Sequence, residues 1–384
     1  MVCLQGAIMP ISFEVRNGKN TYMRNFGTLS VSRKRPRHFY QSYLVLAETI
    51  YIIKFESTLT LSYHMQIYVI IATYNASRWL RACLNSLKTS IVPLQVVVVD
   101  NNSSDDTVAV IESEYQNIIL IKSKDNLGFG KANNVGLNYA LEHNADFAFL
   151  LNQDAYIQPD TIQALVETSI KNPDYFILSP IHLSGDPTKP DNQFAKSYAA
   201  PVNCKQLLSD YLADANNMKD IYETSFVNAA LWLLPKACLL KVGGFDPIFP
   251  HYGEDNDYVH RVKYHGYKVG ICPHVKATHD RNQVSGTTVT TPEKKFHTRF
   301  ISHLIKLKYL NASDNKLIFN VYKGLLMNTF NNLLHLRFAD IIMEFKVVSK
   351  VSSYFKEAKE HRELSKHATA PFLTAVKEPV ALAN

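Results

Sequence analysis

The sequence predicts an α/β protein, with a mostly parallel β-sheet covered by helices on both faces and a helical extension after it. Short, continuous apolar runs alternate with segments of helical periodicity between residues 67 and 170. After residue 280 the chain becomes rich in Thr, Ser and Gly, and then helix-like. Continuous apolar runs are expected of strands buried on both faces of a parallel sheet, and their alternation with helices is expected of a doubly covered sheet.

The elements are expected in a regular order. Strands are expected at residues 67–72, 96–100, 118–121 and 147–151. One helix should begin after Ser77, and three more should lie at 104–114, 131–143 and 159–170. A main domain should therefore occupy residues 65–280. We expect a mobile loop at 281–293, a helical extension at 294–367 and a loose tail at 368–384. Residues 1–64 show weak periodicity, and Met65 directly precedes the first strand, so we expect 1–64 to be a leader, disordered or absent from the functional protein.

Charge and cysteine content narrow the class of protein. The net charge of +7 divides unevenly, since by our count residues 65–280 carry 17 Lys/Arg against 23 Asp/Glu, while both ends are basic. An acidic middle suits a metal site, and the basic C-terminal arm suits either anionic lipid or a solvated helix face. Nucleic-acid binding is not expected, because no recognition motif is present. Five scattered cysteines and the lack of a long apolar run favour a cytoplasmic protein, soluble or peripheral at the inner face of the plasma membrane.

Polar residues directly follow three of the expected strands. They are Thr73, Tyr74 and Asn75 after the first strand, Asp100 and Asn101 at the end of the second, and Asn152, Gln153 and Asp154 after the fourth. Ligands of such sheets bind at the carboxyl ends of the strands. We therefore expect one site, in which Asp100 or Asn101 bonds to a nucleotide base or ribose. Turn and cap formation would explain any one group alone.

A glycine-rich stretch leads into the third helix. Gly128 and Gly130 suggest a dinucleotide-binding turn, but Asn133 occupies the third glycine position, so that motif is not present. The glycines instead suit a tight entry into the helix, from which Lys131 and Asn133 or Asn134 could reach a nucleotide. A purely structural turn is the alternative for either glycine.

Six short motifs appear in a fixed order along the chain. They are Ala-Thr-Tyr-Asn at 72–75, Val-Asp-Asn-Asn-Ser-Ser-Asp-Asp-Thr at 99–107, Gly-Phe-Gly-Lys-Ala-Asn-Asn-Val-Gly at 128–136, Asn-Gln-Asp at 152–154, Gly-Gly-Phe-Asp-Pro at 243–247 and Tyr-Gly-Glu-Asp-Asn-Asp at 252–257. The ordered set covers about residues 67–280. It resembles the family 2 glycosyltransferases, and within them the rhamnosyltransferase-like branch that builds bacterial surface polysaccharides.

The resemblance implies a GT-A fold, a nucleotide-sugar donor, a divalent metal and transfer with inversion at the anomeric carbon. The Asp-x-Asp metal motif of the family falls on residues 152–154, where Asn152 replaces the first carboxylate. Asp154 is then the expected direct ligand, Asn152 a weaker carbonyl contact or a ribose partner, and His279 a further ligand. Mg²⁺ or Mn²⁺ would suit this oxygen-rich site.

The acidic residues at positions 254–257, which we call the acid cluster, should supply the base that takes the proton of the acceptor hydroxyl. We expect Asp255 in this role, then Glu254, then Asp257, with a raised pKa for at least one of the crowded acids. Capping of the following helix is the structural alternative. Trp232 and Tyr252 could stack on an acceptor sugar, although Trp232 lies in an apolar run and suits the core equally well.

These expectations describe an enzyme that moves a sugar from a nucleotide donor to a glycan or lipid-linked acceptor, and the resemblance suggests rhamnose as that sugar. The helical extension could pack on the main domain, pair two subunits or lie on a membrane. Two alternatives stay open. One is a non-catalytic nucleotide- or glycan-binding protein, which Asn152 favours. The other is a sugar nucleotidyltransferase, which would usually carry a glycine-rich basic loop where this chain has Thr73, Tyr74 and Asn75.

Overall fold

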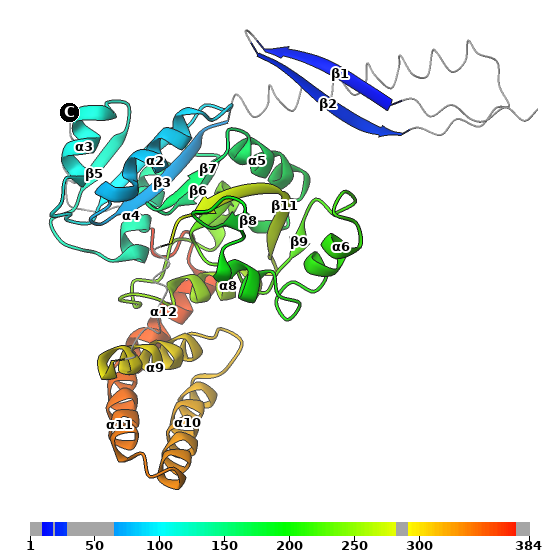
Figure 1. Ribbon diagram of the computed structural model, residues 1–384. Coiled ribbons are helices and arrows are strands. Elements are labelled where there is room, and N and C mark those ends of the chain that lie inside the picture. The colour runs from blue at the N-terminus through cyan, green and yellow to red at the C-terminus, as the bar shows by residue number, and fades with distance from the viewer. Residues whose placement is uncertain (1–9, 18–19, 29–64, 282–290, 374–384) are drawn as a thin grey trace, which may run out of the picture. The chain divides into compact units, whose positions relative to one another are not determined.

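The computed structural model describes residues 10–17, 20–28, 65–281 and 291–373, and their elements are labelled in Figure 1. The chain divides into two compact units, Met1–Leu59 and Thr60–Asn384. In the first unit, β1 (Pro10–Asn17) and β2 (Asn20–Thr28) form an antiparallel pair. These strands lie within the expected leader, whose absence from the functional protein stays a prediction.

A nine-stranded sheet forms the core of the second unit among the described residues. The strands are β3 (Ile67–Thr73), β4 (Gln95–Asp100), β5 (Ile119–Lys122), β6 (Phe147–Leu151), β7 (Ala155–Ile157), β8 (Tyr175–Leu183), β9 (Tyr222–Glu223), β10 (Leu231–Pro235) and β11 (Lys268–His279). Their order is β5-β4-β3-β6-β10-β8-β11-β7, with β9 paired to β11. The pairs from β5 to β6 are parallel, β10 is antiparallel to β6 and β8, and β8 and β11 are parallel.

Helices connect the strands and cover both faces of the sheet. They are α2 (Ser77–Lys88), α3 (Thr107–Glu114), α4 (Phe129–Glu142), α5 (Thr161–Lys171), α6 (Leu207–Asp214), α7 (Lys236–Lys241) and α8 (Glu254–Tyr264), with a single π-helical turn at Phe194–Tyr198. Buried residues of α2, α3 and α5 belong to one apolar cluster, and those of α4, α7 and α8 to another. The predicted α/β class, with its alternating strands and helices, is confirmed.

The packing of the parallel strands explains their continuous apolar sequence. Val97, Val98 and Val99 of β4 are fully buried, and Val98 belongs to the cluster on the opposite face from its two neighbours. On one face α4 lies so close to β3 that a Cβ at Gly136 would be 2.3 Å from Cγ2 of Ile70. The last glycine of the glycine-rich stretch is thus required for helix-to-sheet packing.

The predicted helical extension consists of α9 (Pro292–Leu307), α10 (Asp314–Leu334), α11 (Phe338–Ser352) and α12 (Phe355–His367). The first three helices share an apolar cluster with Ile248 and Phe249, which precede α8. Asp246, in the same loop, lies 2.7 Å from Nζ of Lys308 and 2.6 Å from Nδ1 of His361. These contacts join the extension to the main domain.

Residues 368–373, expected to begin a loose tail, pack against the main domain instead. The backbone N–H of Gly244 donates to the carbonyl of Pro371 at 2.9 Å, and Leu373 is buried. The remainder of the expected tail, and residues 282–290 of the expected mobile loop, lie outside the described residues. Within the described part of the chain, no helix combines the length and apolar character needed to cross a membrane.

Candidate active site

The ends of β3 and β4 are joined by a buried network around Asp100. The hydroxyl of Thr73 donates to Oδ1 of Asp100 at 3.0 Å. Ser103 donates to the same carboxylate from its backbone N–H at 2.9 Å and from its hydroxyl at 2.5 Å. Asp100 is only 2% exposed. The structure thus brings Thr73 and Asp100 together, and Asp100 here fixes the loop after β4 instead of facing solvent.

A side-chain amide joins the ends of β3 and β6. The backbone N–H of Tyr74 donates to Oε1 of Gln153 at 2.7 Å, and Nε2 of Gln153 donates to the carbonyl of Tyr74 at 3.2 Å. The Tyr74 ring itself is exposed. Asn75 takes a left-handed φ of 49°, and its Oδ1 accepts the backbone N–H of Ser104 at 2.9 Å. The residues after β3 are therefore held against both neighbouring strand ends, as the sequence predicted.

The start of α4 lies between the β4 loop and the acid cluster of α8. Oδ1 of Asn101 accepts the backbone N–H of Leu127 at 3.2 Å. At Gly130 an added Cβ would be 3.0 Å from Cβ of Phe245 and 3.5 Å from Cβ of Glu254. Such close approach favours a glycine, because a side chain at this position would require Phe245 to shift by a few tenths of an ångström. Lys131, next along the helix, is exposed.

Two residues expected to contact substrates are buried in the core instead. Asn133 is 2% exposed, and its Nδ2 donates to the carbonyl of Phe129 in its own helix at 2.9 Å. Trp232 is fully buried, with its ring centroid 6.1 Å from that of Phe245 and 5.5 Å from that of Tyr258. Stacking of Trp232 on an acceptor sugar is therefore excluded in this structure, because the apolar run around it forms the interior strand β10.

Asp154, Asn152 and His279 converge across the end of the sheet. Nε2 of His279 lies 3.3 Å from Oδ1 of Asp154 and 3.3 Å from Nδ2 of Asn152. Antiparallel pairing of β7 with β11 sets this geometry by placing His279 opposite Ala155. The His279 side chain is 4% exposed and that of Asp154 is 21% exposed. The three residues that the resemblance assigned to a metal site are thus neighbours, and Asn152 and Asp154 are partly exposed whereas His279 is buried.

Arg281, which the sequence analysis missed, connects this group to the acid cluster. Its Nε lies 3.3 Å from Nδ1 of His279 and 3.3 Å from Oδ2 of Asp191. Its positive charge also acts to lower the pKa of Asp255. Arg281 follows the Ala-Thr-His-Asp motif directly, which was a usable signal, whereas Asp191 lies in a loop without any pattern.

The hydrogen bond from Arg281 also determines the tautomer of His279. A guanidinium N–H can only donate, so Nδ1 of His279 accepts and the neutral ring carries its hydrogen on Nε2, facing Asp154. Coordination of a metal through Nε2 would require Arg281 to release Nδ1. The carboxylate of Asp191 offers Arg281 another acceptor at the same distance.

The donors fit a divalent metal that is shared with a substrate. Among the described residues, no group of three His, Cys, Asp or Glu side chains could hold a metal ion by itself. Asp154 and His279 supply two donors and the Asn152 amide a weaker third. Mg²⁺ commonly binds through one or two carboxylates together with substrate phosphates. The site therefore suits a metal completed by a diphosphate better than one bound by protein alone.

Two carboxylates at the start of α8 have environments that favour their protonated forms. Burial, with a smaller contribution from the charge of Asp255, raises the pKa of Glu254 to about 7, against the effect of a backbone hydrogen bond. Burial also raises the pKa of Asp255 to about 6, although backbone hydrogen bonds and the charge of Arg281 oppose the shift. Glu254 is 5% exposed, and its Oε2 has no hydrogen-bond partner among the described residues. Asp255 is only half-buried.

Asp257, the third candidate base, has a structural role. Its Oδ2 accepts a hydrogen bond from Nε of Arg261 at 2.7 Å, and both side chains are completely buried. The same guanidinium donates to the carbonyls of Val242 and Gly244. A carboxylate engaged in this way is not available to a substrate.

Tyr252 remains accessible at the edge of the acid cluster. Its side chain is 64% exposed, and its φ is 67°. The adjacent His251 accepts through its backbone carbonyl from Nε2 of His297 on α9 at 2.9 Å. The segment before α8 therefore contacts the helical extension directly.

Comparison with known proteins relates part of the chain to a family of glycosyltransferases. Residues 68–223 match the family described as "Glycosyl transferase family 2". The O-antigen chain rhamnosyltransferase WbaN of Salmonella anatum is 26% identical over 240 residues, which cover 60% of this chain and 69% of the relative. The chondroitin synthase of Pasteurella multocida is 28% identical over 107 residues. That match covers 27% of this chain, and the chain spans only 11% of the length of that relative.

Among solved structures, a Staphylococcus aureus TarS fragment in complex with UDP-GlcNAc aligns with 17% identity and a TM-score of 0.46, over 79% of this chain and 88% of the fragment. The family match runs from β3 to β9 and includes the ends of β3, β4 and β6, whereas α8 and β11 lie beyond it. Residues 68–223 are thus similar in sequence to the family 2 glycosyltransferases.

Proposed function

We propose that the protein is an inverting glycosyltransferase that moves a sugar from a nucleotide-diphosphate donor to a hydroxyl of a glycan or lipid-linked acceptor in cell-surface polysaccharide synthesis. One observation carries the proposal. Arg281 contacts His279 beside Asp154, and its charge acts on Asp255. Arg281 would thus act both near the proposed metal ligands and near Asp255, the proposed base.

The donor would lie along the strand ends. Asn101, Tyr74 and the exposed Lys131 surround the region where we place the nucleotide. Asp154 and His279 would hold Mg²⁺ or Mn²⁺ against the diphosphate. When bound, such a metal offsets negative charge on the leaving diphosphate. Arg281 would add a second positive charge near the same group.

Asp255 is the proposed base. It must accept the proton of the acceptor hydroxyl as that oxygen attacks the anomeric carbon from the face opposite the diphosphate. A pKa of about 6 keeps Asp255 ionised at neutral pH and still basic enough to accept a proton. Glu254 is more deeply buried, so we place it behind Asp255 and assign it second. Exposed Tyr252 would face the acceptor sugar.

The donor sugar follows only from relatives. WbaN is named a rhamnosyltransferase, and the TarS fragment was solved with UDP-GlcNAc. dTDP-rhamnose and UDP-sugars are therefore the first donors to test. We propose a cytoplasmic enzyme; pairing of two subunits stays a prediction. A non-catalytic nucleotide-binding protein is the second candidate, which the amide at Asn152 favours.

The test is a thermal-shift screen of the full chain with UDP, dTDP, GDP and CMP, each with Mn²⁺, Mg²⁺ or EDTA. We expect one nucleotide to stabilise the protein in a metal-dependent way, and Asp154→Asn to abolish that dependence. Binding that EDTA leaves unchanged would contradict the metal assignment. Lack of stabilisation by every nucleotide would contradict the proposed function.

A further inference from the structure

The helical extension carries a concentrated exposed apolar surface, which we call the apolar tip. It comprises Leu326, Met327, Phe330 and Leu334 at the end of α10, with Leu336 and Phe338 at the turn into α11, and these side chains are 59–73% exposed. Figure 1 shows α10 and α11 side by side, joined by this turn. Soluble proteins rarely expose so many large apolar residues together unless they bind a partner there.

The acidic residues of α10 and α11 are all paired with cations of neighbouring helices. Asp314 contacts Arg362 and Lys359 of α12. Asp340 lies 2.5 Å from Nζ of Lys295 on α9, and Glu344, fully buried, contacts Arg299 on the same helix. The negative charge of the two helices is therefore neutralised within the protein.

The lysines of the same two helices have no such partners. Within the described residues, Lys316 and Lys323 of α10 and Lys346 and Lys350 of α11 make no ion pair. The two helices that carry the apolar tip thus also carry unpaired positive charge along their length. Anionic partners are favoured by this charge, and partners with the same positive surface are disfavoured.

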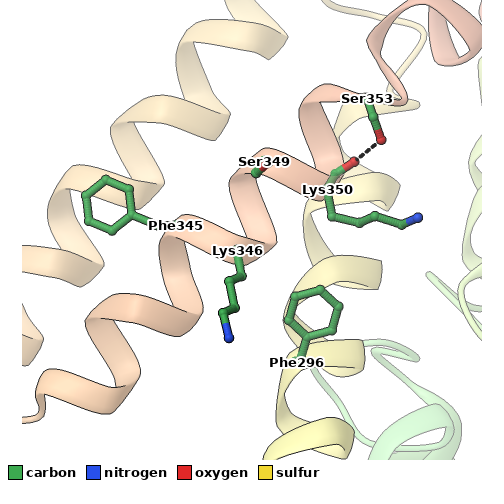
Figure 2. A pocket seen from close by; sticks show the side chains of 6 residues that line it. All are labelled: Phe296, Phe345, Lys346, Ser349, Lys350 and Ser353. Atoms are coloured by element: carbon green, nitrogen blue, oxygen red, sulfur yellow. Dashed lines mark hydrogen bonds between the residues drawn. The ribbon is translucent and has the colours of Figure 1, made fainter.

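The lysines of α11 border an open groove. Figure 2 shows Lys346 and Lys350, one helical turn apart, extending toward the side on which Phe296 of α9 lies. Phe345, Ser349 and Ser353 complete the lining. The ammonium groups and hydroxyls are suited to bind the phosphate of a lipid headgroup, and the aromatic rings are suited to contact its acyl chain.

We propose that the apolar tip and these lysines bind the surface of an anionic membrane, with the tip among the acyl chains and the lysines at the lipid phosphates. A second copy of the chain is a poorer occupant, because a two-fold interface would bring the same unpaired lysines together. The contact of α9 with the loop before α8 would place the acceptor side of the active site on the domain held at that membrane. This proposal rests on vesicle binding, which is measured without enzymatic turnover, so its outcome does not depend on whether the proposed reaction is correct.

The test is cosedimentation of the full chain with vesicles of phosphatidylcholine, with and without phosphatidylglycerol. We expect binding only to the anionic vesicles, and weaker binding at raised salt. Phe330→Ser with Leu334→Ser should abolish binding, whereas Leu212→Ser, at a site 75% exposed on α6, should not. The double change Lys346→Glu and Lys350→Glu should weaken binding at least tenfold. The control double change Lys196→Glu and Lys205→Glu, at exposed sites outside α10 and α11, should leave binding unchanged.

Three results would overturn the proposal. The first is absence of binding to either kind of vesicle. The second is equal binding to neutral and anionic vesicles that the Lys346 and Lys350 changes leave unaltered. The third is a wild-type dimer in light scattering that becomes monomeric with the Phe330 and Leu334 changes, which would identify a second copy as the occupant. Circular dichroism of each variant confirms folding, and these side chains are exposed, so folding should be retained.

Discussion

Replacement of Glu254 by glutamine should change how stability depends on pH. Burial holds the pKa of Glu254 near 7 in the folded protein, compared with an ordinary value of 4.5. The folded state therefore binds this proton more tightly than the unfolded state. Its contribution to stability is complete below pH 4.5 and is lost as the pH rises through 7. The difference of about 2.5 pKa units corresponds to about 3 kcal/mol.

Urea unfolding of the wild type and Glu254→Gln at a series of pH values between 4.5 and about 8 measures this effect. The amide cannot ionise, so the free energy of unfolding of the variant should gain about 3 kcal/mol relative to wild type between the two ends of the series. Glu360→Gln, at an exposed site on α12, controls for the loss of one carboxylate. If the free energy of unfolding depends on pH in the same way for wild type and Glu254→Gln, burial does not raise the pKa of this carboxylate as argued.

Further predictions concern three other acidic residues and the amide Asn152. Asp246→Asn should lower the free energy of unfolding by about 3–5 kcal/mol in urea denaturation, since it leaves Lys308 buried without a counterion; the added Lys308→Met change should recover part of the loss. Asp255→Asn should reduce kcat/KM by about a hundredfold or more and keep nucleotide binding, and wild-type kcat/KM should rise with pH through about 6. Asp257→Asn should destabilise the fold in thermal melts, because Arg261 loses its buried partner. Asn152→Asp should strengthen Mn²⁺ binding in the presence of the nucleotide by calorimetry.

The sequence predicted the parallel part of the sheet well, because its apolar runs have a physical cause that acts locally. Strands such as β4 are buried on both faces, so almost every side chain must be apolar. The strand-end rule also placed Tyr74 and Gln153 at neighbouring strand ends, where the structure joins them by two hydrogen bonds. Helices α9 to α12 were also predicted, since their apolar residues recur at helical spacing.

Long-range packing limited the prediction of the site. The run around Trp232 suits either a core strand or a sugar-binding wall, and only the pairing of β10 between β6 and β8 shows that it is interior. Asp257 looks like its neighbours in sequence, but helical spacing places Arg261 four residues later to neutralise it. Arg281 and Asp191 are far apart in the chain, and no local pattern reveals that they meet.

We propose that the ends of β3, β4 and β6 and the start of α4 form the nucleotide site. Hydrogen–deuterium exchange of the full chain, with and without UDP and Mn²⁺, tests this assignment; dTDP or GDP replaces UDP where the thermal screen selects it. We expect slower exchange at residues 73–75, 100–103, 127–131 and 152–154 on binding. Slower exchange confined to α9 to α12 or to α6, with these four segments unchanged, would contradict it.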